Sequence, residues 1–233
     1  MKAAVFDIYG DYGHFGKQYT TSSPLTFSFP PPPTVKGIIG AILGFDKNSY
    51  HTKLDQAGLK LGVSILSPIR HSRITINHIN TKGGHWTIEH GRIQIRTEFL
   101  CFPRYRLYIS LSDGDVYESL KKMLISHQTV FTLSLGLSEL LANFNWVKED
   151  NLTPVENCKG EIETVFPVDT IEKKTLHLTP GNRYQSEHVP VFMSNERIVS
   201  LYQDVIMETN GKLFQAVVKK GYQVDNGNLI YLF

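Results

Sequence analysis

The segment from residue 70 to residue 98 reads RHSRITINHINTKGGHWTIEHGRIQIRTE, and its composition does not fit inside a compact core. In each half, single isoleucines are separated by arginine, histidine, threonine and asparagine, which is typical of a β-strand with little buried surface. Lys82-Gly83-Gly84 lies between the halves and provides a turn. The sequence therefore predicts a two-stranded arm over residues 70–98.

Positive charge is concentrated in this arm and in the strand predicted after it. Between residues 70 and 106 the formal charge is +5, whereas the rest of the chain carries −3 and the whole protein +2. Four histidines in the same window can add partial charge. A local excess of this kind attracts polyanions, although the protein as a whole is nearly neutral.

Such an arm is suited to a nucleic-acid backbone, because its cations can contact phosphates while an aromatic ring near its tip inserts between bases. The alternative is a solvated ribbon whose tryptophan folds back onto the protein. The candidate RNA-binding residues of the arm are Arg70, His71, Arg73, Lys82, His85, Trp86, Arg92 and Arg96.

The segments on both sides of the arm predict a mixed body of strands and helices. Alternating apolar residues predict strands at 2–9, 59–66, 99–111 and 129–135, and apolar stripes predict two helices, one capped by Thr34 and one capped by Asp113. This order is that of a ferredoxin-like or RRM-like βαββαβ domain with an inserted hairpin, an α+β fold. We expect it over residues 1–145.

Residues 146–233 are expected to form a smaller β-rich domain. Residues 147–188 show few clear periods and are interpreted as a connector with short strands. Further on, Asn210-Gly211 and Asp225-Asn226-Gly227 lie between apolar runs, and each predicts a β-hairpin.

The strand predicted after the arm contributes two more cations. Arg104 and Arg106 share one of its faces with Tyr108, beside Asp7 and Tyr9 of the first strand. RNA-recognition modules place base-stacking aromatic residues on these two strands. The two arginines are therefore predicted RNA contacts, and the alternative is that the C-terminal domain covers this face.

The loop after the first strand combines aromatic rings, a histidine and a cation. His14, Lys17 and Tyr19 of this loop are suited to contacts with the end of a nucleic acid. The alternative is an aromatic loop that packs onto the body.

Several classes of site are not expected. Two distant cysteines argue against a disulfide framework and favour a reducing cytoplasm. No apolar run approaches the roughly 20 residues of a membrane span. Metal-ligand spacings, phosphate-binding loops and dinucleotide fingerprints are absent from the sequence, so we expect no metal and no cofactor.

Catalysis is the main alternative to simple binding. Cleavage of RNA without a metal needs a base, an acid and a cation, and His14, Lys17, Tyr50 and His71 are side chains of these types. Because the chain has nine histidines, side chains of these types can occur together by chance. We therefore assign no catalytic residue. A metal-independent endoribonuclease and a protein-interaction module without RNA remain the two alternative functions.

The N-terminal region resembles a known family. The resemblance is carried by the run from His14 to Thr26 (HFGKQYTTSSPLT), by residues 29–32 (FPPP) and by residues 37–44 (GIIGAILG). These residues are similar to the signature of the Cas-five family of CRISPR-associated proteins, within the RAMP superfamily, and the variant looks closest to type I-B. Gly136-Leu137-Ser138-Glu139 and the closing Asn-Gly turn are also similar to the family.

The resemblance implies an RRM-like domain with an extended hairpin called the thumb, which would correspond to residues 70–98. It further implies a non-catalytic subunit of a type I interference (Cascade) complex that caps the 5′ handle of the guide RNA and nucleates the backbone of the complex. The implied partners are the guide RNA, the Cas-seven backbone subunit, the large subunit and, through the complex, target DNA.

One branch of the family, in type I-C, cleaves the repeat RNA with tyrosine, lysine and histidine side chains that include an adjacent Lys-His pair. This sequence contains no Lys-His dipeptide. The resemblance therefore favours a binding subunit over an enzyme.

Overall fold

The structure is a computed structural model that describes residues 1–20, 22–79 and 91–233. Its body is organised around a four-stranded sheet in the order β3-β6-β1-β7, in which all neighbours are antiparallel. These strands are β1 (Lys2–Gly10), β3 (Lys60–Ile65), β6 (Arg104–Ser110) and β7 (Ala142–Asn151). Residues far apart in the sequence therefore share one sheet, with β1 and β6 at its centre.

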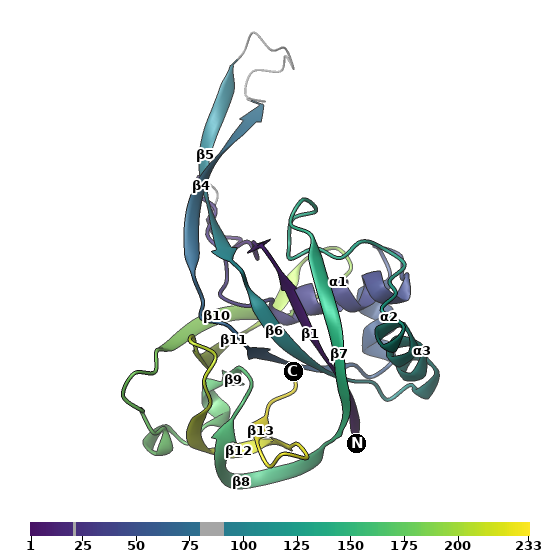
Figure 1. Ribbon diagram of the computed structural model, residues 1–233, viewed down its shortest axis with the longest axis vertical. Coiled ribbons are helices and arrows are strands. Elements are labelled where there is room, and N and C mark those ends of the chain that lie inside the picture. Colours follow the sequence, from purple (N-terminus) through teal and green to yellow (C-terminus); the bar gives the residue numbers. More distant parts are fainter. Residues whose placement is uncertain (21, 80–90) are drawn as a thin grey trace.

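Three helices pack on one face of this sheet (Figure 1). They are α1 (Pro32–Leu43), α2 (Tyr50–Gln56) and α3 (Gly114–Ile125). Every second residue of β1 points toward them, and Phe6 and Ile8 are fully buried against apolar side chains of α1 such as Ile39. Burial of each such side chain stabilises the fold by about 1.5–3 kcal/mol.

The two long helices begin in different ways. Asp113 caps α3 as predicted, because its carboxylate accepts hydrogen bonds from the backbone N–H groups of Asp115 and Val116. The predicted cap at Thr34 is wrong, since α1 already begins at Pro32 after the N-cap residue Pro31. A proline in the first turn has no N–H to leave unsatisfied, so the proline run starts the helix.

The predicted arm is a long antiparallel hairpin of β4 (His71–Ile79) and β5 (Arg92–Cys101), which we call the thumb. Figure 1 shows it projecting from the body. The short strand β2 (Tyr12–Gly13) pairs with the last residues of β5, where the thumb joins the body. The root extends three residues beyond the predicted limit at 98. The predicted turn at Lys82-Gly83-Gly84, with His85 and Trp86, lies outside the described residues.

The prediction of a strand at 129–135 is wrong. The N–H groups of Val130 and Phe131 donate to carbonyls of the last turn of α1, and Phe131 is 52% exposed. The fourth strand of the sheet is instead β7, which spans the predicted division after residue 145. Residues 129–135 form a loop whose apolar residues alternate because Leu133 and Leu135 are buried in the core.

The C-terminal part is rich in strands and lies beside the sheet (Figure 1). Its strands are β8 (Thr153–Ile162), β9 (Phe166–Pro167), β10 (Tyr184–Met193), β11 (Val199–Glu208), β12 (Phe214–Gln223) and β13 (Leu229–Ile230). Short 3-10 helices occur at Val168–Thr170 and Lys173–Thr175. The strand β8 is long, but most of its side chains are exposed, so it lacks the apolar alternation that would have predicted it.

One of the two predicted C-terminal hairpins is confirmed. Strands β12 and β13 pair antiparallel across the turn at 225–227. The prediction of a hairpin at Asn210-Gly211 is wrong, because the strands on its two sides do not pair with each other. β11 pairs with β10 and β9, whereas β12 pairs with β8 and β13. The turn therefore connects two different sheets.

The mixed α+β class is confirmed. None of the helices in the described part of the chain has the length and apolar character that a bilayer crossing would need. The division into residues 1–145 and 146–233 stays a prediction.

Substitution of Gly136 tests the close contact between this glycine and the loop after β1. Its φ of +102° is unfavourable for other residues, and a Cβ at this position would lie 1.8 Å from the carbonyl oxygen of His14. We expect Gly136→Ala to lower the free energy of unfolding by about 3 kcal/mol or more, measured by urea denaturation. Gly181→Ala is the matched control, because Gly181 has a φ of +84° but open space around it. Equal effects of the two substitutions would contradict the close contact at Gly136.

The environment of His51 of α2 predicts that the protein becomes less stable in acid. It is buried, and within the described residues neither ring nitrogen has a hydrogen-bond partner. Burial, together with the nearby cations Lys36 and Arg197, lowers the pKa of His51 from 6.5 to about 4. The unfolded chain therefore binds the proton more tightly, so this contribution to stability is complete above pH 6.5 and is lost as the pH falls to 4.

The loss attributable to His51 is on the order of 3 kcal/mol over this range. It is measured as the difference in pH dependence of unfolding between the unsubstituted protein and His51→Phe. Parallel pH profiles for the two proteins would show that His51 is not buried in its neutral form.

Candidate nucleic-acid interface

The register of the thumb separates two chemically different faces. Residues directly opposite one another in an antiparallel pair lie on the same face. The pairs Thr75–Arg96 and Asn77–Gln94 therefore share one face, which we call the cationic face. It consists of residues 71, 73, 75, 77 and 79 of β4 and residues 92, 94, 96, 98 and 100 of β5, and its apolar members are the exposed Ile79 at the outer end and the buried Leu100 at the root.

The opposite face of the thumb is largely apolar. It carries Ile74, Ile76, Ile93 and Ile95, which are partly exposed, together with His78. A hairpin with one polar and one apolar face explains why the segment mixes isoleucines with cations, because successive residues of a strand point to opposite faces.

Exposed arginines dominate the outer part of the cationic face. Arg92 and Arg96 are exposed, and the side chain of Arg73 is 62% exposed. At the root, Glu98 lies within 3.7 Å of Arg73 and 3.5 Å of His71. The Arg73 side chain is exposed and its separation from Glu98 is longer than a hydrogen bond, so Arg73 can also contact a phosphate. Arg70, just before β4, is also exposed.

The loop residues predicted as RNA contacts have different environments. His14 is buried, and its Nδ1–H donates to the carbonyl of Glu98 at 2.7 Å. Lys17 forms an ion pair with the buried carboxylate of Glu187 at 3.2 Å. Tyr19 is 72% exposed. His14 and Lys17 therefore fasten the loop to the thumb and to β10, whereas Tyr19 presents its ring to solvent.

The sheet face that carries Arg104 and Arg106 is covered at one end. Tyr108 is buried beneath the C-terminal residues Ile230 and Leu232, and its hydroxyl donates to Glu163 at 2.6 Å. The predicted alternative, coverage by the C-terminal region, holds for this end of the sheet.

The other end of the same face remains open. Asp7 is buried and accepts hydrogen bonds from Arg106 Nε at 2.8 Å and from Arg104 Nη2 at 3.2 Å. The hydrogen bond to Asp7 raises the pKa of Arg106. Arg104 lies at the open end, with its side chain 51% exposed. Arg106 therefore has mainly a structural partner, whereas Arg104 faces solvent.

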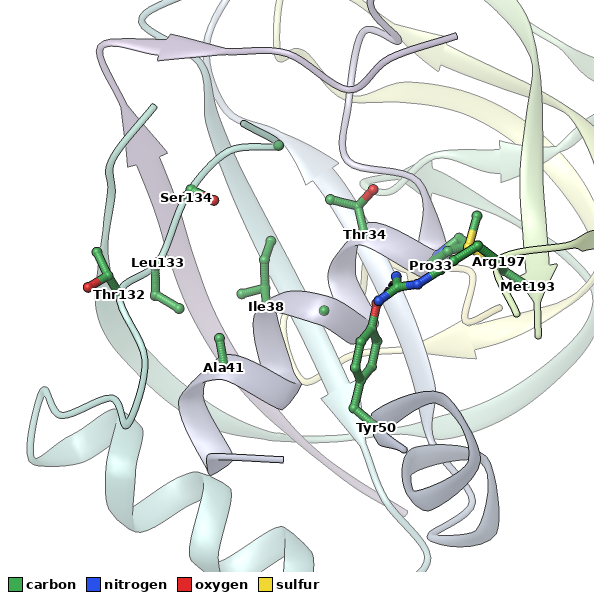
Figure 2. Close-up of a pocket in the computed structure, with 12 residues that line it drawn as sticks. Pro33, Thr34, Ile38, Ala41, Tyr50, Thr132, Leu133, Ser134, Met193 and Arg197 are labelled. Atoms are coloured by element: carbon green, nitrogen blue, oxygen red, sulfur yellow. Dashed lines mark hydrogen bonds between the residues drawn. The ribbon is translucent and has the colours of Figure 1, made fainter. Parts of the chain in front are cut away.

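A separate cavity of about 280 Å³ lies beside α1 (Figure 2). Arg197 reaches across it from the connection between β10 and β11, and its Nη1–H donates to the hydroxyl of Tyr50 at 2.6 Å. Its guanidinium also lies over the ring of Tyr50, 5.1 Å from the centroid. Sequence reasoning missed Arg197, because 147 residues separate it from Tyr50 and no local pattern marks it.

The four side chains considered for cleavage are held by different partners. Tyr50 bonds to Arg197, and Lys17 pairs with Glu187. The two histidines both contact Glu98, His14 through its carbonyl and His71 through its carboxylate. These contacts distribute the four groups over three separate clusters.

A family match and solved structures place the chain among known proteins. Residues 4–204 match the family described as CRISPR-associated protein (Cas_Cas5). A search of the curated proteins finds no significant match.

Solved structures share the fold at low sequence identity. A CRISPR protein from Archaeoglobus fulgidus has a TM-score of 0.61 at 16% identity, with 99% of this chain and 98% of that chain covered. A chain of a CRISPR RNA-guided surveillance complex has a TM-score of 0.52 at 13% identity, with 93% and 91% covered. A chain of a type III-B Cmr-beta complex bound to cognate target RNA and AMPPnP has a TM-score of 0.53 at 11% identity, with 91% and 86% covered.

The family match covers most of the chain, and it includes both the loop after β1 and the thumb. The N-terminal resemblance seen in the sequence is thereby confirmed. The protein belongs to the Cas5 family of CRISPR-associated proteins.

Proposed function

We propose that this protein is a non-catalytic RNA-binding subunit of a type I CRISPR interference complex. The observation that carries the proposal is the exposed cationic face of the thumb, which projects from the body (Figure 1). Family membership supports it, as do similar chains from an RNA-guided complex and from a complex bound to target RNA.

The arrangement of the thumb suits the backbone of a single strand. Alternate residues on one face of a β-strand are about 6.7 Å apart, so Arg92 and Arg96 lie about 13 Å apart on one side of the hairpin. Arg73 extends the same face toward the root. Because these side chains are exposed, they can contact phosphates of one strand without disturbing the core.

In this proposal the thumb and the adjoining loop cap the 5′ handle of the guide RNA, and the subunit nucleates the backbone of the complex. Its partners are the Cas-seven backbone subunit, the large subunit and, through the complex, target DNA. We interpret the sheet and helices of the body as a ferredoxin-like domain. The strand order β3-β6-β1-β7 with antiparallel neighbours supports that interpretation.

A binding role without catalysis is supported by the partners that already engage two of the candidate acid–base groups. Lys17 and Tyr50 have their own ionic or hydrogen-bonded partners on different elements. General acid–base chemistry requires such groups within hydrogen-bond reach of one phosphodiester.

Substitution of the outer arginines tests the role of the cationic face. We expect Arg92→Ala combined with Arg96→Ala to weaken binding of single-stranded RNA, because two phosphate contacts are lost. The slope of log K against log salt should decrease in magnitude by about 1.4, at about 0.7 per phosphate. The measurement is a titration of fluorescein-labelled RNA at several salt concentrations.

Lys122→Ala combined with Lys159→Ala is the matched control, because it removes the same charge from exposed positions on α3 and β8. The control should bind RNA with the affinity of the unsubstituted protein, and both double variants should keep its melting temperature. An unchanged salt slope in the arginine variant would reject the thumb as the RNA-binding element.

A further inference from the structure

A second cavity, of about 450 Å³, lies at the open end of the sheet face, next to the root of the thumb. Its lining includes Tyr9 of β1, Ser67 before β4, Phe102 and Arg104 around the β5–β6 turn, and Asn145 of β7. A volume of this size lies within the range of about 300–1,000 Å³ that small ligands occupy in proteins.

Phe102 is the most unusual residue of this cavity. It has a φ of +50°, which is strained for any side chain other than glycine, and it is 65% exposed. A phenyl ring on a strained backbone position gains little for the fold when it points into water. Strain of this kind is typical of functional positions.

The turn that carries Phe102 is fixed by three hydrogen bonds. The N–H of Phe102 donates to the carbonyl of Asp11 at 2.8 Å. The hydroxyl of Ser67 donates to the carbonyl of Phe102 at 3.2 Å and accepts from the N–H of Arg104 at 3.1 Å. The backbone that carries the ring of Phe102 is therefore fixed at both of its peptide groups.

A second ring extends this platform. Tyr12 stacks on Phe102 with centroids 6.4 Å apart and an interplanar angle of 28°, and its other contact is edge-on to Phe99 of the thumb. Two partly exposed rings thus form an aromatic surface at the base of the hairpin.

Other residues of the lining supply polar groups. The guanidinium of Arg104 lies over the ring of Tyr9, 5.7 Å from the centroid, and Asn145 Nδ2 donates to the hydroxyl of Tyr9 at 3.4 Å. Arg104 uses one nitrogen for Asp7, and a guanidinium has five N–H donors. Arginine and asparagine are residues that form bidentate contacts with base edges.

We propose that this cavity binds one unstacked nucleobase of a single-stranded RNA, an inference that rests on the proposed function. The base stacks on Phe102, and Arg104 and Asn145 hydrogen-bond its edge. Aromatic stacking plus edge recognition is how proteins read unpaired bases in RNA. Phe102 follows Arg96 by six residues, about 20 Å along an extended strand, so an RNA bound to the thumb reaches the cavity within a few nucleotides.

The test uses the full chain and RNA oligonucleotides with 2-aminopurine at one position at a time. In the unsubstituted protein, one position should show strong quenching from stacking. Phe102→Ala should abolish this quenching and weaken binding about tenfold, within the range that one stacked base contributes. Phe102→Trp should retain both the quenching and the affinity.

Two further variants separate binding from folding. Phe102→Gly relieves the left-handed backbone, so its melting temperature should equal or exceed that of the unsubstituted protein while RNA binding falls as in Phe102→Ala. Phe131→Ala removes another half-exposed phenylalanine, on the loop after α3, and should bind RNA normally.

The outcomes distinguish the cavity from the thumb. If the unsubstituted protein does not bind RNA, the proposed function and the base site are both wrong. If the arginine variant of the thumb loses affinity but Phe102→Ala and Phe102→Gly bind normally, with quenching unchanged, only the base site is wrong.

Discussion

The pairing register between β4 and β5 determines which side chains the thumb presents on the same face. The thumb has little core of its own, so its shape comes from the backbone ladder and from contacts at its root. There, Glu98 joins the thumb to His14 of the adjoining loop, and β2 adds a short third strand. A slip of one residue would exchange the faces of one strand and scatter the cations. The existing register gathers Arg73, Arg92 and Arg96 on one side.

The body determines which neighbouring surfaces stay open. Helices cover one face of the sheet, and the C-terminal strands cover Tyr108 at one end of the other face. What remains exposed is the end next to the thumb, where Arg104 and Phe102 lie. The positive charge of the thumb and the aromatic surface at its root are therefore adjacent, and a single strand bound to one can reach the other. This proximity gives one RNA both electrostatic attraction and base contacts.

The arm and the central strands could be predicted because their signals are local: alternation, charge and a glycine turn. Long-range partners could not. Residues 129–135 alternate like a strand, yet their N–H groups bond to α1, whereas β7 pairs with β1 despite weak alternation. In the candidate site, the exposed arginines could be predicted from the positive charge of the segment. The ion pair of Lys17 with Glu187 and the backbone conformation of Phe102 could not, because each depends on residues distant in the sequence.

Binding of the guide RNA by the thumb can be tested by photochemical crosslinking of the assembled complex, with peptides mapped by mass spectrometry. Guide RNA should crosslink through its 5′ end to peptides from residues 71–79 and 92–102. Crosslinks confined to α3 or to the C-terminal strands, with none on the thumb, would contradict this role of the thumb.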